Sequence, residues 1–337
     1  MYKNILEIAI PTYNRTLQLR KCLKSITVAL KLLSQKDRNL IGISIYDNSI
    51  NDFNKRRQII NNFQQKFKSL NINYFKYKVT GFNIGFCNNF ATLLINSKSD
   101  YTWVLPDDDV ARFDSIKTIL KTIKSYKPCF INGGWGMKSL ISYQNDKLRN
   151  DDNASNSVKQ VLNGQKKINT FLLKFTVQLQ EYVYKTSQIK KFFLKESNIE
   201  LINDMCPGLY AIYCMLDNSP SILLNRSLGI FRDNEPNSKW RHLFHKYSLI
   251  DWPIVSEKIH KFGWINKNQL CQSIKIYENT ILNLAHRPDI LLGINRKYKL
   301  SFFKLFYYHK STLIKALVIS VPMIFFKVFK KIKRDFF

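Results

Sequence analysis

The sequence predicts an α/β domain, with a mostly parallel, twisted sheet flanked by helices, followed by a helical C-terminal extension. Two observations carry this prediction. Through roughly the first 135 residues, short apolar runs of strand length alternate with helical patterns, which is typical of βαβ units. After about residue 238 the pattern is helical and aromatic. At 337 residues with 45% hydrophobic content, the chain is long enough to bury a large core.

The expected strands and helices follow one another regularly in the first half. The strands are expected at residues 5–10, 41–46, 72–77, 101–106 and 129–132. The helices between them are expected at residues 15–33, 53–67, 84–95 and 113–125, where apolar side chains recur at helical spacing. Parallel neighbouring strands need such crossover helices, so this order predicts one doubly wound domain.

Each of the main strands has a reason to end where it does. Pro11 and Pro106 end the first and fourth strands, because proline has no N–H to donate to a sheet ladder. The second strand stops at a polar turn of Asp47, Asn48 and Ser49.

The second half of the domain has a less regular pattern. Residues 149–159 are polar and predict a mobile loop that could act as a lid. Strands are predicted at residues 178–184 and 221–231, with a helix between them at residues 204–216.

Four polar clusters follow strands that are expected to be parallel, so they should share one edge of the sheet, where ligands of open α/β sheets bind. They are Pro11 to Arg15, Asp47 to Ser49, Asn83 to Asn89, and Asp107 to Asp109. In the last cluster, three adjacent carboxylates repel one another and raise each other's pKa. A divalent cation that joins them to a diphosphate would relieve this repulsion. A solvated acidic turn is the alternative for such a triplet taken alone.

The four clusters, in this order and at this spacing, resemble the glycosyltransferases of family two. These are inverting nucleotide-sugar transferases with the Rossmann-like GT-A fold. The resemblance covers roughly residues 5–112, and the second half is similar to the abequosyltransferase-like branch. It implies a GT-A catalytic domain at residues 1–237, with a nucleotide-sugar half at about 1–135 and an acceptor half at about 136–237.

The resemblance implies nucleotide-sugar-binding roles for residues of the first three clusters. The first turn would back the base and ribose; its residues are Pro11, Thr12, Tyr13 and Arg15. Asp47 would accept a hydrogen bond from a ring N–H of the base. The third cluster would form a loop close to the donor, with Gly85 permitting the approach; its residues are Asn83, Gly85 and Asn88. Singly, these residue types are ordinary turn and cap residues, and it is the ordered set that favours a site.

The acidic triplet corresponds to the D-x-D motif of the family. The resemblance implies that Asp109 ligates the metal directly, with Asp107 as the second metal ligand. Asp107 or Asp108 would also contact ribose or sugar hydroxyls. The expected cofactor is Mg²⁺ or Mn²⁺, which would neutralise the leaving diphosphate.

The catalytic base is expected near the start of a helix in the second half. Asp204 is the candidate, although many relatives carry Glu-Asp where this chain has Asn203 before it, and Asp204 equally suits an ordinary helix cap. Glu181 and Glu200 are the alternatives. Arg232 and Trp240 are candidates to hold a phosphate and to stack on a sugar, or else are a surface arginine and a core tryptophan.

The reaction implied is displacement at the anomeric carbon of a nucleotide-diphosphate sugar by a hydroxyl of the acceptor. The expected acceptor is a lipid-linked or surface glycan, such as capsule or lipopolysaccharide O-antigen, carried on a polyprenyl diphosphate. A nucleotidyltransferase is the first alternative, but no Gly-rich triphosphate loop follows the first strand. A basic nucleic-acid-binding protein is the second. Because the expected ligand edge gathers acids, no nucleic-acid partner is expected.

The charge balance and the C-terminus point to an anionic membrane surface. Lys and Arg number 53 against 24 Asp and Glu, a net charge of +29 that implies an anionic partner. Residues 238–312 form the expected helical extension. Residues 313–337 interleave basic and aromatic residues around an apolar run too short to span a bilayer, which suits a peripheral anchor; a terminal helix packed on the domain is the alternative. Six scattered cysteines and no export signal predict a cytoplasmic protein at the inner face of the cell membrane.

Overall fold

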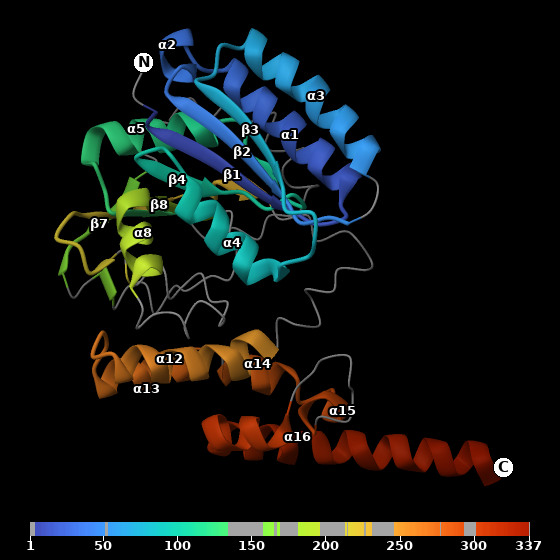
Figure 1. Ribbon diagram of the computed structural model, residues 1–337. Helices are drawn as coiled ribbons and strands as arrows, with labels where there is room; N and C mark the ends of the chain where they lie inside the picture. Colours follow the sequence, from blue (N-terminus) through green and yellow to red (C-terminus); the bar gives the residue numbers. More distant parts are fainter. Residues whose placement is uncertain are drawn as a thin grey trace. The chain divides into compact units, whose positions relative to one another are not determined.

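The computed structural model describes most of the chain. The described residues are 4–50, 53–133, 158–164, 167–168, 181–195, 213, 215–225, 227–230, 246–276, 278–292 and 301–336. The chain divides into two compact units, Met1–Asn234 and Glu235–Phe337, which are described separately. Figure 1 shows the elements of each.

The first unit contains an eight-stranded mixed sheet with the strand order β3-β2-β1-β4-β8-β6-β9-β7. Its strands are β1 Leu6–Thr12, β2 Ile41–Asp47, β3 Tyr74–Val79, β4 Tyr101–Val104, β6 Phe130–Asn132, β7 Val158–Leu162, β8 Tyr182–Lys185 and β9 Ser221–Leu224. Strands β3, β2, β1 and β4 are parallel neighbours, as the sequence predicts. Strand β8 is antiparallel to both β4 and β6, so β6 runs in the same direction as β4.

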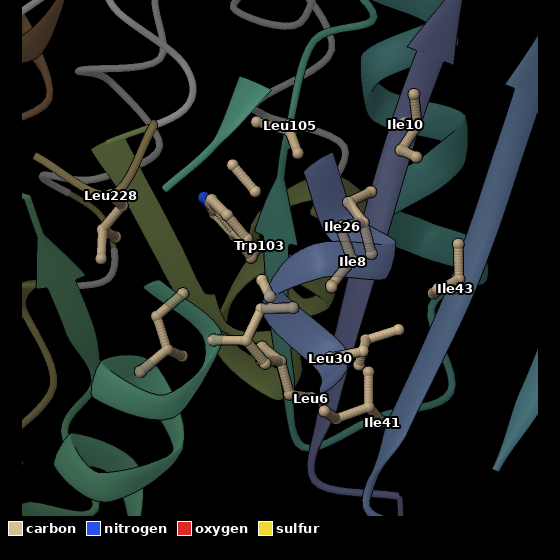
Figure 2. Close-up of a cluster of buried hydrophobic side chains, with 14 of the residues drawn as sticks. Leu6, Ile8, Ile10, Ile26, Leu30, Ile41, Ile43, Trp103, Leu105 and Leu228 are labelled. Atoms are coloured by element: carbon tan, nitrogen blue, oxygen red, sulfur yellow. The ribbon is translucent and has the colours of Figure 1, made fainter. Parts of the chain in front are cut away.

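Helices cover both faces of this sheet (Figure 1). One face carries α1 Thr16–Lys31, α3 Phe53–Ser69 and α5 Ser115–Tyr126, and the other carries α4 Gly85–Asn96 and α8 Thr186–Leu194; the short α2 is Gln35–Arg38. The main core lies between the sheet and the first of these helix layers. There Trp103 of β4 is fully buried in one cluster with Ile8 and Leu30 (Figure 2). Complete burial of such side chains contributes about 1.5–3 kcal/mol each.

Two predictions for the second half of this unit need correction. The run at residues 221–231 is not one strand, because after β9 the chain leaves the large sheet and forms β10 Gly229–Ile230. Strand β10 pairs antiparallel with β5 Val110–Ala111 in a separate two-stranded sheet. Of the polar segment predicted as a mobile loop at residues 149–159, residues 149–157 lie outside the described part of the chain, as do most residues of the helix predicted at 204–216. Residues 158 and 159 begin strand β7, which lies at the edge of the sheet, is partly exposed or exposed over residues 158–161 and ends at the buried Leu162. Edge strands tolerate the polar composition that otherwise indicates a loop.

The second unit is helical in its described part, as predicted. A π-helical segment, Tyr247–Asp251, leads into α12 Trp252–Lys261, α13 Lys267–Lys275, α14 Glu278–Asn283 and α15 Pro288–Leu291. Helix α13 begins at a capping box formed by Asn266 and Gln269. The last helix, α16 Phe302–Phe336, contains one non-helical residue, His309. It begins well before the tail predicted at residues 313–337. None of the described helices has both the length and the apolar content that crossing a bilayer requires.

Candidate active site

The first three predicted clusters lie along one edge of the sheet, which we call the carboxyl rim. It is formed by the carboxyl ends of the parallel strands β1 to β4. In the register of these strands Thr12 lies beside Asp47, and Asp47 lies beside Val79, after which the chain enters the third cluster. Strand β4 leads through Pro106 into the acidic triplet at the same rim. Convergence at this rim therefore follows from the strand topology.

The acidic triplet, Asp107 to Asp109, is held from the first strand. Asp107 and Asp109 are each only 3% exposed. The Thr12 hydroxyl donates to Asp107 Oδ2 at 2.6 Å, and Arg15 Nη1 lies 3.2 Å from Asp107 Oδ1. Arg15 also forms an ion pair with the half-exposed Asp108. The end of β1 and the turn after it thus determine the position of Asp107.

The electrostatics of the triplet favour a bound cation. Burial raises the pKa of Asp107 to about 7, and the neighbouring charge of Asp108 adds to this rise. Arg15 and the hydrogen bond from Thr12 act in the opposite direction, but they do not cancel the burial. A cation placed against Asp107 would lower that pKa, so a metal and a proton compete for this carboxyl.

The donor set suits a metal that a substrate helps to hold. No group of three or more His, Cys, Asp or Glu side chains positioned for a metal occurs among the described residues. Asp107 and Asp109 supply two buried carboxylates two positions apart. Mg²⁺ is typically bound by one or two carboxylates together with substrate phosphates and waters, rather than by a cage of protein ligands alone. The residues present therefore fit a Mg²⁺ or Mn²⁺ ion shared with a diphosphate.

Asp47 is anchored at the carboxyl rim by hydrogen bonds to both of its carboxylate oxygens. Its side chain is fully buried, and Oδ2 accepts hydrogen bonds from Arg56 Nε at 2.9 Å and from the Tyr77 hydroxyl at 2.7 Å. Its Oδ1 accepts the Ser49 backbone N–H at 2.9 Å. The Ser49 hydroxyl in turn accepts the Asn14 N–H at 2.7 Å. In this structure Asp47 therefore fixes two turns of the rim, and contact with a nucleotide base stays a prediction.

Arg56 and Tyr77 were not predicted as site residues from the sequence. A signal for Arg56 was present, because it lies at helical spacing with Ile60, Phe63 and Phe67 on the buried side of α3. An arginine in an otherwise apolar stripe indicates a buried acidic partner. Burial, followed by the bond to Asp47, raises the pKa of the Tyr77 hydroxyl, which therefore stays protonated and donates.

The third cluster comprises the end of a loop, at Asn83 and Ile84, and the first turn of α4, which begins at Gly85. Asn83 Oδ1 accepts the Gly85 N–H at 2.9 Å, and Asn48 Nδ2 donates to the Gly85 carbonyl at 3.1 Å. Gly85 has φ +79°, a left-handed conformation that glycine adopts without strain, and an added Cβ would meet nothing within 4 Å. The glycine is therefore required by the backbone turn rather than by crowding. Asn88 is exposed, and its side chain donates to the Ile84 carbonyl at 2.9 Å.

The remaining candidates divide between described and undescribed parts of the chain. Pro11 is buried in β1, and Tyr13 is 41% exposed in the turn that follows. Glu181 is buried beside the carboxyl rim. Burial raises the pKa of its carboxyl group to about 7, although the hydrogen bonds that it accepts lower this pKa. The predicted base, its second alternative and the weak acceptor candidates lie outside the described residues; these are Asp204, Glu200, Arg232 and Trp240.

This parallel half-sheet with acids at its carboxyl rim is the architecture of GT-A glycosyltransferases, and solved structures agree. A mannosyltransferase from Pyrobaculum calidifontis, PcManGT in complex with GDP-Man and Mn²⁺, matches with a TM-score of 0.54 at 9% identity, over 95% of this chain and 88% of that one. S. aureus TarS 1–349 in complex with UDP-GlcNAc matches with a TM-score of 0.51 at 13% identity, over 92% of this chain and 90% of that one. At such identities the likeness concerns the fold.

The family model described as glycosyl transferase family 2 matches residues 7–183, more than half of the chain. The protein therefore belongs to glycosyl transferase family 2 and is a glycosyltransferase, as the four clusters indicated. The abequosyltransferase-like branch within the family stays a prediction. A search of curated proteins gave no match.

Proposed function

We propose that this glycosyltransferase moves a sugar, with inversion, from a nucleotide-diphosphate sugar to a lipid-linked or surface glycan acceptor. The observation that carries the proposal is the buried pair of Asp107 and Asp109 at the carboxyl rim, with Thr12 and Arg15 directed at it. The complexes named above, of TarS with UDP-GlcNAc and of PcManGT with GDP-Man and Mn²⁺, support a nucleotide-sugar donor and a divalent ion.

Asp109 and Asp107 are the proposed metal ligands. The bound Mg²⁺ or Mn²⁺ supplies neutralisation of the charge that develops on the leaving diphosphate. Arg15 lies against Asp107 and Asp108 with about half of its side chain exposed, so it can also meet a donor phosphate. The turn from Pro11 to Tyr13 is proposed to back the nucleotide. The backbone around Asn83, Gly85 and Asn88 is proposed to approach the donor closely, which Gly85 permits.

The acceptor half of the proposal rests on the family resemblance. Asp204 is the proposed base that removes the proton from the acceptor hydroxyl. Arg232 is proposed to hold a phosphate, and Trp240 to stack on a sugar. The proposed catalytic domain is residues 1–237, with the nucleotide-sugar half at about 1–135, and residues 238–312 form the helical extension.

A donor screen tests the proposed reaction. The full chain, with Mn²⁺, is incubated with UDP-, GDP-, CDP- and dTDP-sugars, and release of the nucleoside diphosphate is measured. We expect slow hydrolysis of sugars of one nucleotide, abolished by a chelator and restored by added Mn²⁺. Release that persists in the chelator would contradict the metal role. Pyrophosphate release from a nucleoside triphosphate, without release from any sugar nucleotide, would contradict the proposed reaction.

Helix α16 carries the proposal that the protein associates peripherally with the inner, anionic face of the cell membrane. Phe303 and Tyr307 before the non-helical His309, and Ile314 and Val318 after it, are one helical turn apart in each pair and are 45–83% exposed. Lys304, Lys310 and Lys315 are exposed beside them. Exposed aromatic and aliphatic side chains flanked by lysines are typical of a helix that lies in a membrane interface. Residues 313–336 of the predicted tail belong to this helix.

Deleting residues 327–337 is expected to move the protein from the membrane to the soluble fraction. The deletion removes four lysines and one arginine, and each contributes about 1 kcal/mol at an anionic surface. Flotation with vesicles of anionic lipid measures the binding, and neutral vesicles measure the apolar part alone. Because the deletion also removes Asp335, it lowers the net charge by 4. The control for total charge therefore replaces four exposed lysines of the first unit with glutamine: Lys31, Lys36, Lys55 and Lys68. Equal binding by the truncated and full chains would contradict the anchor.

A further inference from the structure

Glu181 lies at the carboxyl rim without belonging to any of the four clusters. It directly precedes β8, which is antiparallel to β4, so the amino end of β8 meets the carboxyl end of β4. The Glu181 carbonyl accepts the Gly133 N–H at 2.7 Å, at the end of β6. The residue is 1% exposed. Its carboxylate is therefore buried beside the site where the triplet begins.

The Glu181 carboxylate holds the turn of residues 227–229. Oε2 accepts the Leu228 backbone N–H at 2.9 Å, and Oε1 accepts a hydrogen bond from the Ser227 hydroxyl. The same carboxylate fills the space above Gly133, where an added Cβ would lie 1.8 Å from Oε2. A catalytic base must be able to reach the hydroxyl of the acceptor. Both carboxylate oxygens of Glu181 are buried and accept hydrogen bonds from the turn, so Glu181 is placed to hold the turn rather than to act as the base.

The turn of residues 227–229 is linked to the acidic triplet by two short connections. The Leu228 carbonyl accepts the Arg112 N–H at 3.1 Å, and the Leu228 side chain is buried in the same core cluster as Trp103 and Leu105 (Figure 2). Strand β10 then pairs with β5, with Ile230 beside Val110. Val110 directly follows Asp109. The chain after the triplet is thus fixed by the segment that Glu181 holds.

We propose that Glu181 is a positioning residue for the metal site: through the turn of residues 227–229 and the pairing of β10 with β5, it sets where Asp109 lies. The inference rests on the proposed function, because it assumes that the triplet binds a divalent ion. Asp107 is held separately from β1 by Thr12 and Arg15. The two carboxylates are therefore fixed from opposite sides, by different parts of the chain.

The test replaces Glu181 with glutamine, which keeps the shape of the side chain but turns an amide toward the Leu228 N–H or the Ser227 hydroxyl. The matched control is Glu7→Gln. Glu7 is also 1% exposed on the same sheet and also accepts several hydrogen bonds, including those from Ser97 at 2.8 Å and the Lys98 N–H at 2.9 Å. It lies toward the amino end of β1, away from the rim. Both variants are made in the full chain.

Two measurements decide the question. Mn²⁺ affinity is measured in the presence of the nucleoside diphosphate found in the donor screen, by loss of the free-ion electron paramagnetic resonance signal relative to a protein-free blank, and amide hydrogen exchange is followed at residues 110–112. Glu181→Gln is expected to weaken Mn²⁺ binding about 10-fold, the lower end of the effect of losing a group that hydrogen-bonds a metal ligand, because Glu181 acts on Asp109 through the turn. It is also expected to speed exchange of the Arg112 amide. Glu7→Gln is expected to lower the melting temperature but to leave both readouts within about twofold.

Every outcome bears on the inference. Unchanged Mn²⁺ affinity and exchange in Glu181→Gln, or equal effects in Glu7→Gln, would overturn it. If Glu181→Gln does not fold, Ser227→Ala removes one of the two hydrogen bonds and is expected to give a smaller change of the same kind; no change would overturn the inference. If the wild type binds no Mn²⁺, the proposed metal role fails, and unchanged Arg112 exchange would overturn the positioning role separately.

Discussion

Replacing Asp109 with asparagine is expected to reduce sugar transfer by at least about 10²-fold in kcat/KM, and to abolish the Mn²⁺ dependence of nucleotide binding. A metal that stabilises charge on a leaving group contributes several kcal/mol to the transition state, and each 1.4 kcal/mol is about tenfold in rate. Asparagine keeps the size of the side chain but removes the charge that holds the ion. The fold should survive, because Asp107 keeps its hydrogen bond from Thr12.

The measurement combines donor hydrolysis with calorimetric titration of the nucleoside diphosphate, with and without Mn²⁺. The control is Asp37→Asn, since Asp37 lies in α2 and pairs with Lys124 on the surface. Asp37→Asn should behave as the wild type in both assays. A fully active Asp109→Asn variant with unchanged Mn²⁺ dependence would refute the metal role of the triplet.

The parallel half of the fold was predictable because its signals are local. Fully buried strands such as β1 and β2 read as mostly apolar runs, interrupted by Glu7 in the first and Ser44 in the second, and each is followed by an amphipathic helix that must return the chain to the same edge of the sheet. Once the strands are parallel, the positions of Thr12, Asp47 and Asp107 at one rim follow without further information. This is why four short clusters were enough to indicate the family.

The contacts that hold the site were not predictable, because they join residues far apart in the sequence. The carboxylate of Glu181 meets Leu228, and β5 meets β10, through pairings that no local pattern contains. Strand β10 is two residues long, so it has no periodicity to detect. For Asp47 the role was predicted from the resemblance, whereas the partners that bury its charge come from α3 and β3.

Replacing Arg56 with methionine is expected to lower the free energy of unfolding by about 3–5 kcal/mol, the usual cost of removing one partner of a buried ion pair. Arg56 and Asp47 are 1% and 0% exposed, so solvent cannot take over the lost interaction. The melting temperature should fall by roughly 6–20 °C, at about 2–4 °C per kcal/mol. Urea unfolding followed by circular dichroism measures the change. The control, Lys124→Met, breaks the exposed pair with Asp37 and should cost less than about 1 kcal/mol.

The double variant Arg56→Met with Asp47→Asn separates stability from binding at the carboxyl rim. Asparagine removes the buried negative charge that Arg56 balances in the wild type. The double variant should therefore be more stable than the Arg56→Met variant, and the departure from additivity measures the coupling between the two residues. If Asp47 also accepts a hydrogen bond from a ring N–H of the nucleotide base, the double variant should regain stability while its affinity for the nucleoside diphosphate stays reduced. The reason is that asparagine lacks the negative charge that strengthens this hydrogen bond. Recovery of both stability and binding would limit Asp47 to anchoring Ser49 and the turn at Asn14. A double variant as unstable as the sum of the single changes would show that the two residues do not act as a pair.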